Sequence, residues 1–265
     1  MTGQFVRAFV LALFFVVFVG YAAAPVLGED TSKSVQPLRV GITPDVPPLV
    51  FKQGDQIVGI EAELAKMLGE ELGRPVKFVE VKWDAQIPAL LEGRTDIIMS
   101  SMTVTRERQV RIAFAEPFMK SGLVAAVRAE DVPKYPTTES ILNVAGIVGF
   151  VPNTTSESFV RKNLPYAQQH YLSYPREAVN ALQQRWIDIF IGDAPTVIWL
   201  VSENESSIAG IWRPLNEEHF AWGMRKGDKD LIARVNAALA QFRLDGRLNM
   251  VLHKWLPKQY LERMK

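Results

Sequence analysis

The sequence predicts an α/β protein built from two similar halves. Short runs rich in β-branched residues alternate with segments whose apolar residues recur at helical spacing, which is typical of sheets covered by helices. A helix end, a turn carrying an aspartate and a short strand follow one another twice, at residues 90–97 and 181–189. The chain has 265 residues and is 48% hydrophobic, so it can bury one large core or two moderate ones.

The chain opens with an expected export signal. Arg7 is the only charged residue before Glu29, and residues 8–24 contain no charged or amide side chain. A basic residue, an apolar stretch and small residues in that order predict a secretory signal peptide over residues 1–28, followed by a polar leader at 29–37. The alternative is an uncleaved anchor, because the apolar run approaches the length that spans a bilayer.

The first half is expected to alternate strands and helices. Its main helix is predicted from apolar residues at helical spacing, and a glycine and a proline just beyond it end the pattern. The expected elements are a strand at 38–42, a turn-rich loop at 43–48, a helix at 61–72, a strand at 76–81, a helix capped by Asp84 and a strand at 97–99.

The second half repeats this order, and the C-terminal segment returns to the first half. The expected elements are a strand at 144–148, a helix after the capping-box pair Thr154 and Glu157, a helix at 177–185, a strand at 187–191 and two amphipathic helices at 230–242 and 248–255. We therefore expect a first lobe of residues 38–120 and 221–265, a second lobe of residues 121–220, and two hinge crossings between them.

Composition excludes several classes of function. Lysine and arginine number 30 against 29 for aspartate and glutamate, so no concentrated basic face for nucleic acid is expected. The chain has no cysteine, which excludes disulfides and thiolate metal sites, and its 3 histidines are far apart. Because no nucleophile elbow or phosphate-binding glycine loop occurs, we expect no enzyme, no cofactor and no bound metal.

The richest polar segment follows the strand at 97–99. Residues 100–108 include Ser101 and Thr103 among their hydroxyl side chains and end at Arg108. A guanidinium can hold a carboxylate through two parallel hydrogen bonds, and hydroxyl groups can complete its shell. The alternative is structural, with Thr105 capping a helix whose arginines lie on its solvated face.

Three further residues have two interpretations each. Asp193 ends a strand five residues after the second repeated aspartate, where it can receive an ammonium group or cap the next helix. Thr155 follows a capping Thr154 and lies where helix N–H groups attract anions. Trp83 can form an aromatic wall for a ligand or belong to the core. The residues expected in the core outright are Met102, Trp212 and Trp222.

Five motifs cover most of the chain after residue 37. They are VGIEAELA at 58–65, IPAL at 87–90, SMTVT followed by an arginine at 101–108, FAEPF at 114–118 and MRKGD at 224–228. Together they resemble the family 3 periplasmic solute-binding proteins, the polar amino-acid-binding components of ABC importers. The resemblance implies two Rossmann-like lobes joined by two hinge crossings, the type II periplasmic binding protein fold. It also implies a periplasmic protein, expected to be a monomer, that delivers an α-amino acid to an ABC transporter permease.

The resemblance also implies roles for individual residues. The implied ligand-binding residues are Arg108, Ser101, Thr103 and Thr155 for the ligand carboxylate, Asp193 for its ammonium group and Trp83 for its side chain. Two departures concern the side-chain pocket. Relatives have an aromatic residue in the loop where this chain has VPPL at 46–49, and the position that is often acidic in relatives binding basic amino acids is Thr43, although Asp45 is close. We therefore expect a ligand other than lysine or arginine.

Two other functions stay open. A periplasmic dehydratase of the same fold would need an acid in the cleft to protonate a departing hydroxyl, and the sequence singles out none. A membrane-anchored sensor would keep the N-terminal segment as its anchor and report the bound ligand to a membrane partner.

Overall fold

The structure is a computed structural model that describes residues 35–263, which belong to one unit of tertiary contacts. The predicted signal peptide at 1–28 and most of the predicted leader at 29–37 lie outside the described residues. Within the described part, no helix combines the length and the apolar character that crossing a bilayer requires.

The first sheet consists of β1 (Leu38–Ile42), β5 (Val76–Glu80), β6 (Ile97–Ile98), β7 (Ala113–Phe114) and β15 (Gly223–Met224). Its order is β5-β1-β6-β15-β7, in which β1 pairs in parallel with β5 and β6. β15 runs antiparallel to both β6 and β7. The C-terminal segment therefore completes a sheet that the N-terminal half begins. We call this sheet and the helices packed on it lobe 1.

The second sheet consists of β9 (Leu123–Arg128), β10 (Ile147–Phe150), β11 (Gln168–Tyr171), β12 (Ile189–Asp193) and β13 (Ile208–Ile211), and with its helices it forms lobe 2. Its order is β11-β10-β12-β9-β13. β10 pairs in parallel with β11 and β12, and β9 pairs antiparallel with β12 and β13. Both sheets thus place their first parallel strand between two others, and on one side they add one strand of opposite direction and then an outer strand antiparallel to it. The prediction of an α/β protein with two similar halves is confirmed.

The repeated aspartates explain why the two halves look alike in sequence. Asp96 Oδ2 accepts a hydrogen bond of 3.0 Å from the backbone N–H of Arg39 in β1. Asp188 Oδ2 accepts one of 2.9 Å from the backbone N–H of Ile147 in β10. Each aspartate therefore ties the turn before one parallel strand to the beginning of the neighbouring strand, and each also forms an ion pair with an arginine of its own lobe.

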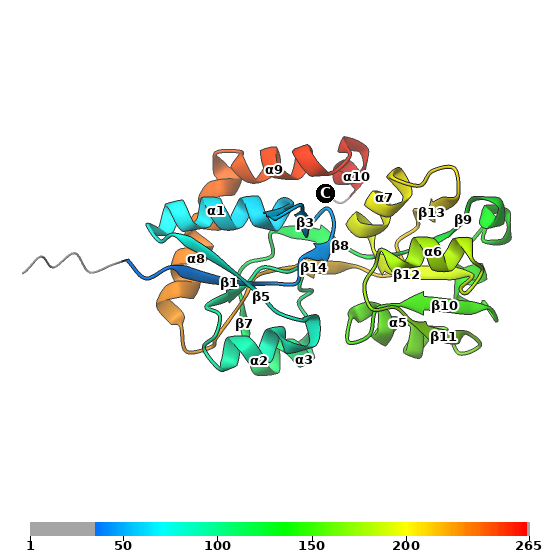
Figure 1. The fold of residues 1–265 in the computed structure, drawn as a ribbon, viewed down its shortest axis with the longest axis horizontal. Helices are drawn as coiled ribbons and strands as arrows, with labels where there is room; N and C mark the ends of the chain where they lie inside the picture. The colour runs from blue at the N-terminus through cyan, green and yellow to red at the C-terminus, as the bar shows by residue number, and fades with distance from the viewer. Residues whose placement is uncertain (1–34, 264–265) are drawn as a thin grey trace, which may run out of the picture. The chain divides into compact units, whose positions relative to one another are not determined.

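Two short strands carry the chain between the lobes. β8 (Met119–Ser121) leads out of lobe 1, β14 (Glu218–Phe220) leads back, and the two pair antiparallel (Figure 1). Beside them Gly122 has no room for a side chain, because a Cβ there would lie 2.4 Å from the carbonyl oxygen of Asn216. We propose this strand pair as the hinge, near the predicted lobe boundaries at 121 and 220.

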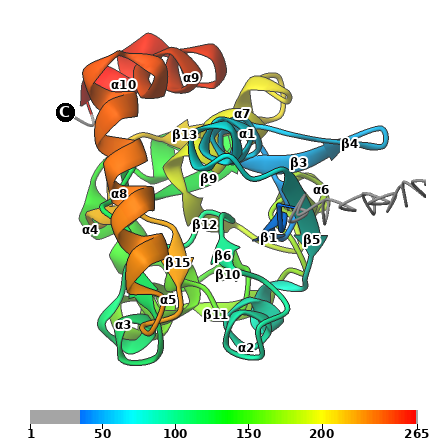
Figure 2. The same ribbon diagram turned by 90° about the vertical axis from the view of Figure 1, so that its left-hand side faces the viewer.

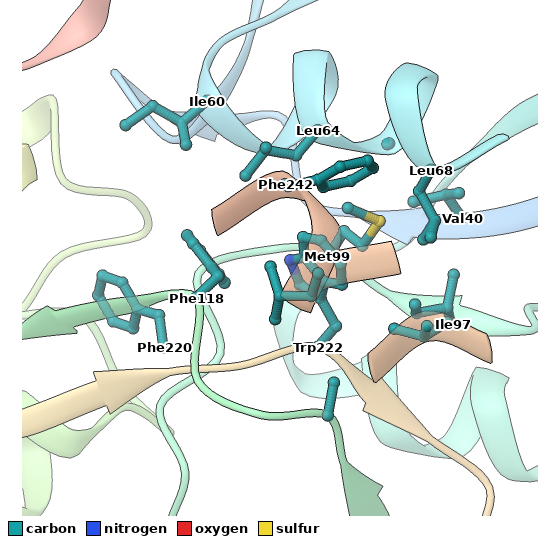
Figure 3. Packing of buried hydrophobic residues seen from close by; sticks show 14 of the residues in the cluster. Val40, Ile60, Leu64, Leu68, Ile97, Met99, Phe118, Phe220, Trp222 and Phe242 are labelled. Atoms are coloured by element: carbon teal, nitrogen blue, oxygen red, sulfur yellow. The ribbon is translucent and has the colours of Figure 1, made fainter. Parts of the chain in front are cut away.

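The helices of lobe 1 lie on both faces of its sheet. α1 (Ile60–Leu72), α8 (Lys229–Leu244) and α9 (Arg247–Trp255) share one core with β1, and α2 (Gln86–Leu91) and α3 (Arg106–Arg111) flank a smaller cluster on the other face (Figure 1). Figure 3 shows Leu64 and Leu68 of α1 facing Phe242 of α8. Trp222 is fully buried in this core and stacks on Phe118 with ring centroids 5.6 Å apart. This packing holds the C-terminal helices to lobe 1.

The remaining elements are α4 (Thr138–Leu142), α5 (Thr155–Asn163), α6 (Glu177–Gln183) and α7 (Ala194–Ser202) in lobe 2, α10 (Lys258–Arg263) at the C-terminal end, and the 3₁₀ turns η1 (Trp83–Ala85) and η2 (Ala129–Lys134). A small antiparallel sheet of β2 (Asp45–Val46), β3 (Val50–Gln53) and β4 (Gln56–Val58) was not predicted, and Figure 2 shows its β3–β4 hairpin projecting beside α1. It places the loop after β1 beside lobe 2, where the aromatic ring of Phe51 lies 5.4 Å from that of Trp199.

Several local predictions are wrong. Asp84 lies inside η1 and caps no helix, since the N-cap of α2 is Ala85. The strand expected at 144–148 is β10, which begins only at 147. Thr154 is the N-cap of α5, but its side chain accepts no capping hydrogen bond and Glu157 accepts from the backbone N–H of Asn153 instead, so no capping box forms. Trp212 is 41% exposed because its ring lies over Gly210 of the edge strand β13 rather than in the core.

Candidate functional site

One cavity of about 70 Å³ lies between the lobes. It is lined by all the residues predicted to bind a ligand, namely Trp83, Ser101, Thr103, Arg108, Thr155 and Asp193. These residues come from η1, the loop after β6, α3, the first turn of α5 and the end of β12. The structure therefore brings the predicted residues together, and their roles toward a ligand stay a prediction.

Arg108 faces the cavity because of how α3 begins. The Thr105 hydroxyl caps this helix by accepting the backbone N–H of Arg108 at 3.2 Å, as the structural interpretation expected. The Arg108 side chain nevertheless does not lie on the solvated face with Arg106 and Arg111, which are exposed. Its Nη1 donates to the carbonyl oxygen of Thr103 at 2.8 Å, and its guanidinium carbon lies 5.1 Å from the centre of the Trp83 ring. These contacts fix the guanidinium against the cavity wall.

Burial and nearby carboxylates act on the pKa of Arg108 in opposite directions. Burial lowers the pKa of its guanidinium, and the nearby carboxylates of Asp193, Glu218 and Glu107 act in the opposite direction. A guanidinium stays protonated in proteins, so lobe 1 presents a positive charge to the cavity. Two of its three acidic neighbours belong to other elements, and the sequence analysis had not placed Glu218 in the site.

Asp193 presents a carboxyl group from lobe 2. It occupies the N-cap position of α7, but its side chain makes no capping hydrogen bond, and its Oδ1 atom is shielded from solvent without a partner. Burial first, and then the negative charge of Glu218, raise the pKa of Asp193 well above its ordinary value, while Arg108 opposes this shift. The capping interpretation is therefore wrong for the side chain, which is free to receive a donor from the cavity.

Ser101 is held by an unusual backbone. Its φ of 51° lies in the left-handed region, and its N–H donates to Oε1 of Glu61. Glu61 is buried, and burial raises its pKa to about 8, with the Ser101 N–H acting against that rise. The Oε2 atom of Glu61 has no partner. Glu61 thus supports the loop that carries the hydroxyl groups rather than the cavity itself.

The two threonines donate their hydroxyl hydrogens to Glu218 in the structure. Thr103 Oγ1 lies 2.9 Å and Thr155 Oγ1 lies 3.1 Å from the same oxygen, Oε2 of Glu218. Sequence reasoning missed this glutamate, because it lies in the polar run at 216–219 without strand periodicity or a motif. The pairing of β14 with β8 brings it beside Thr103 and Thr155, which line the cavity.

Trp83 connects the lobes as well as lining the cavity. Its Nε1 donates to the carbonyl oxygen of Asn153 in lobe 2 at 2.9 Å, while its ring packs beside the small cluster of α2. The core interpretation therefore holds in part, and contact of this ring with a ligand stays a prediction. The ring is a wall of the cavity, and its edge completes a core.

The loop after β1 contributes an acidic group that weakens one expectation about the ligand. Asp45 lines the cavity, and its partial burial raises its pKa to about 6, with Arg176 of lobe 2 opposing this rise. Thr43 also lines the cavity but is buried, with its hydroxyl donating to the carbonyl oxygen of Val81. The expectation of a non-basic ligand rested on Thr43 and on the loop at 46–49 and noted only that Asp45 is close, whereas the structure places Asp45 at the cavity wall.

Nothing in the described residues resembles a metal centre, since no group of three or more metal-ligating side chains occurs among residues 35–263. What the site offers instead is one guanidinium, several hydroxyls, an aromatic face and carboxylates on opposite walls. Such a set binds a small polar molecule through charge and hydrogen bonds. Fold and site thus define a two-lobed α/β protein with a ligand cavity between its lobes.

The chain belongs to the bacterial extracellular solute-binding proteins, family 3, whose family model matches residues 38–258. It is 26% identical over 219 residues to the L-cystine-binding protein TcyJ of Escherichia coli strain K12, with 82% of each chain covered. It is 25% identical over 252 residues to the L-arginine-binding protein of Pseudomonas aeruginosa, covering 89% of this chain and 94% of that protein.

A solved structure with the same fold is that of the ancestral amino acid-binding protein AncCDT-1, a precursor of cyclohexadienyl dehydratase. It is 32% identical, with a TM-score of 0.77, over 83% of this chain and 95% of that one. The predicted family, the two-lobed type II fold and the solute-binding class are confirmed by these comparisons.

Proposed function

We propose that this protein captures a free α-amino acid between its lobes in the periplasm and delivers it to an ABC transporter permease, without catalysing a reaction. The observation that carries this proposal is a guanidinium and a carboxyl group on opposite walls, Arg108 from lobe 1 and Asp193 from lobe 2. An α-amino acid carries a carboxylate and an ammonium group on one carbon, so it can satisfy both walls at once. The names of the cystine-binding and arginine-binding relatives support the same ligand class.

Transport would use the closure of the lobes. A ligand that contacts both walls binds the closed form more tightly than the open form, so it shifts the equilibrium toward closure. The contact of Trp83 with Asn153 and the ring contact of Phe51 with Trp199 join the two lobes, and they support this proposal because closure would use contacts of this kind. The permease would then distinguish the closed, loaded protein from the open one.

A thermal-shift panel tests the ligand class. The chain from residue 29 onward is purified, unfolded and refolded to remove carried-over ligand, and heated with each of the twenty standard L-amino acids and L-cystine. A ligand at about 100 times its Kd adds about 2.7 kcal/mol to the free energy of unfolding. For a chain of this size the midpoint should rise by about 5–10 °C with one or a few of these compounds. A flat panel would contradict the proposed ligand class.

Two further measurements test the rest of the proposal. The intact mass of the protein from its native host should lack residues 1–28, whereas retention of that segment would favour the sensor alternative. A cyclohexadienyl substrate should be left unchanged by the refolded protein, whereas its turnover would favour the dehydratase alternative.

A further inference from the structure

Glu218 lies where both lobes and the hinge meet. It begins β14, the strand that returns from lobe 2 to lobe 1, and it is 6% exposed. Its Oε2 accepts hydrogen bonds from Thr103 of lobe 1 and Thr155 of lobe 2, at 2.9 and 3.1 Å. One buried carboxylate oxygen therefore joins a hydroxyl of each lobe beside the cavity.

The other oxygen of Glu218 is held equally firmly. Its Oε1 accepts a hydrogen bond of 2.8 Å from Nδ2 of Asn216. The orientation of that amide is determined by its other end, because Asn216 Oδ1 accepts the backbone N–H of Leu123 at 2.8 Å. Donors therefore approach both carboxylate oxygens, and a glutamine could not satisfy them all, since one end of its amide is itself a donor.

This arrangement decides what the two hydroxyls can offer to a ligand. A threonine hydroxyl has one hydrogen and two lone pairs, and a carboxylate can only accept. With their hydrogens directed to Glu218, the hydroxyls of Thr103 and Thr155 keep only lone pairs for the cavity. They would repel a ligand carboxylate and attract N–H groups.

We propose that Glu218 is a positioning residue that makes the hydroxyls of Thr103 and Thr155 hydrogen-bond acceptors, so that with Asp193 they receive the ligand's ammonium group. The inference rests on the proposed function and refines it, because the family resemblance implies that these threonines hold the carboxylate. In this assignment the carboxylate of the ligand is left to Arg108 and to backbone N–H groups.

The charge of Glu218 also acts on Asp193. The charged and titratable groups around Asp193 are Glu218, which raises its pKa, Arg108, which lowers it, and the buried phenol of Tyr260; Asp45 lines another part of the cavity. An ammonium group binds best when Asp193 is ionised, so affinity should rise with pH through the raised pKa of Asp193. Removing the charge of Glu218 lowers that pKa, so the rise should move to lower pH.

The test compares Glu218→Gln with Glu217→Gln. Glu217 is the neighbouring residue, its side chain is 60% exposed, and it pairs with Lys120 at the surface, so it is a matched control of the same chemistry. Affinity is measured by calorimetry between pH 5 and pH 8, with the standard L-amino acid or L-cystine that gives the largest thermal shift. Glu218→Gln should bind the amino acid about tenfold or more weakly at neutral pH, and its affinity should begin to rise at a lower pH than that of wild type. Glu217→Gln should match wild type in both affinity and pH profile.

The outcomes separate this inference from the proposed function. If wild type binds no amino acid, the proposed function fails and the inference fails with it. If wild type binds and Glu218→Gln binds with the same affinity and pH profile, only the inference is overturned. Should Glu218→Gln not fold, Thr155→Val removes one hydroxyl and leaves the charge. It should lose affinity several-fold without moving the pH profile, and unchanged affinity would overturn the inference.

Discussion

Replacing Arg108 with alanine would remove the only cationic side chain among the residues that line the described cavity. In the structure Nη1 of Arg108 is already engaged with the Thr103 carbonyl oxygen, so Nη2 and Nε remain to hold a carboxylate. The alanine variant loses these donors and the guanidinium that packs on Trp83. It also leaves Asp193 without the positive charge that lowers its pKa.

The size of the effect follows from burial. Truncating one partner of a buried, hydrogen-bonded charge pair costs about 2–5 kcal/mol of binding free energy, because the other charge is left without a partner. At 1.4 kcal/mol for each factor of ten, the Kd should rise by about 30-fold to 4,000-fold. Arg108→Lys should fall between wild type and alanine, because an ammonium keeps the charge but cannot form the two parallel hydrogen bonds.

Calorimetry with the strongest amino acid of the thermal-shift panel measures this loss. Arg106→Ala is the control, because Arg106 is on the same helix and exposed to solvent. Its affinity should equal that of wild type, and the melting temperatures of all variants without ligand should be compared. Equal affinity of Arg108→Ala and wild type, with both proteins folded, would refute the assignment of this cavity as the ligand site.

Three other predictions concern stability and closure. Burial raises the pKa of Glu61 to about 8 in the folded protein, against an ordinary value of 4.5. Its contribution to the free energy of unfolding is therefore fully present below pH 4.5 and decreases as the pH rises from 4.5 to 8. Glu61→Gln should flatten this fall of about 1.4 kcal/mol per pH unit in urea unfolding, and an unchanged slope would contradict the assignment. Asp96→Asn should lower the free energy of unfolding by about 1.5–3 kcal/mol at pH 7, since Asp96 accepts hydrogen bonds from Arg39 and its pKa is held low by them. Because that pKa is lowered, the loss should shrink as pH falls through it, and a loss independent of pH would count against the ion pair. Trp83→Phe keeps a ring but removes the Nε1 donor to Asn153, so the Kd should rise about threefold to tenfold, less than for Trp83→Ala; a Kd of Trp83→Phe equal to that of wild type would show that the hydrogen bond is not what matters.

Most of the fold could be predicted because its signals are local. The helix at α1 was predicted within one residue of its observed beginning, since its apolar periodicity and its Gly73 ending are both read from neighbouring residues. The aspartates at 96 and 188 revealed the two halves because each performs the same local task beside a parallel strand. The capping box at 154–157 does not form, because Glu157 accepts from the backbone N–H of Asn153 rather than from that of Thr154 and the Thr154 side chain accepts no cap hydrogen bond. Local competition of this kind is not visible in spacing.

Part of the site could also be predicted. Arg108 and Asp193 are each placed by their own strand end and following helix, so their approach to one cavity follows from the fold class. The sequence could not decide, however, whether the side chains at the two helix beginnings cap the helix or face the cavity. Thr105 caps as expected, whereas Asp193 holds the N-cap position without using its side chain.

The sequence by itself determined the α/β class, the two similar halves, the family and the cavity residues of each lobe, because those features are written in short segments. Tertiary structure alone decided the partners that meet across the hinge. Glu218 contacts residues 63 and 115 positions away in the chain, and Asp45 faces Arg176 from the opposite lobe. No periodicity or spacing encodes such distant pairs, since they depend on how β8 and β14 align the lobes. The polarity of the Thr103 and Thr155 hydroxyls, and through it the proposed place of the ammonium group, therefore became visible only in the folded molecule.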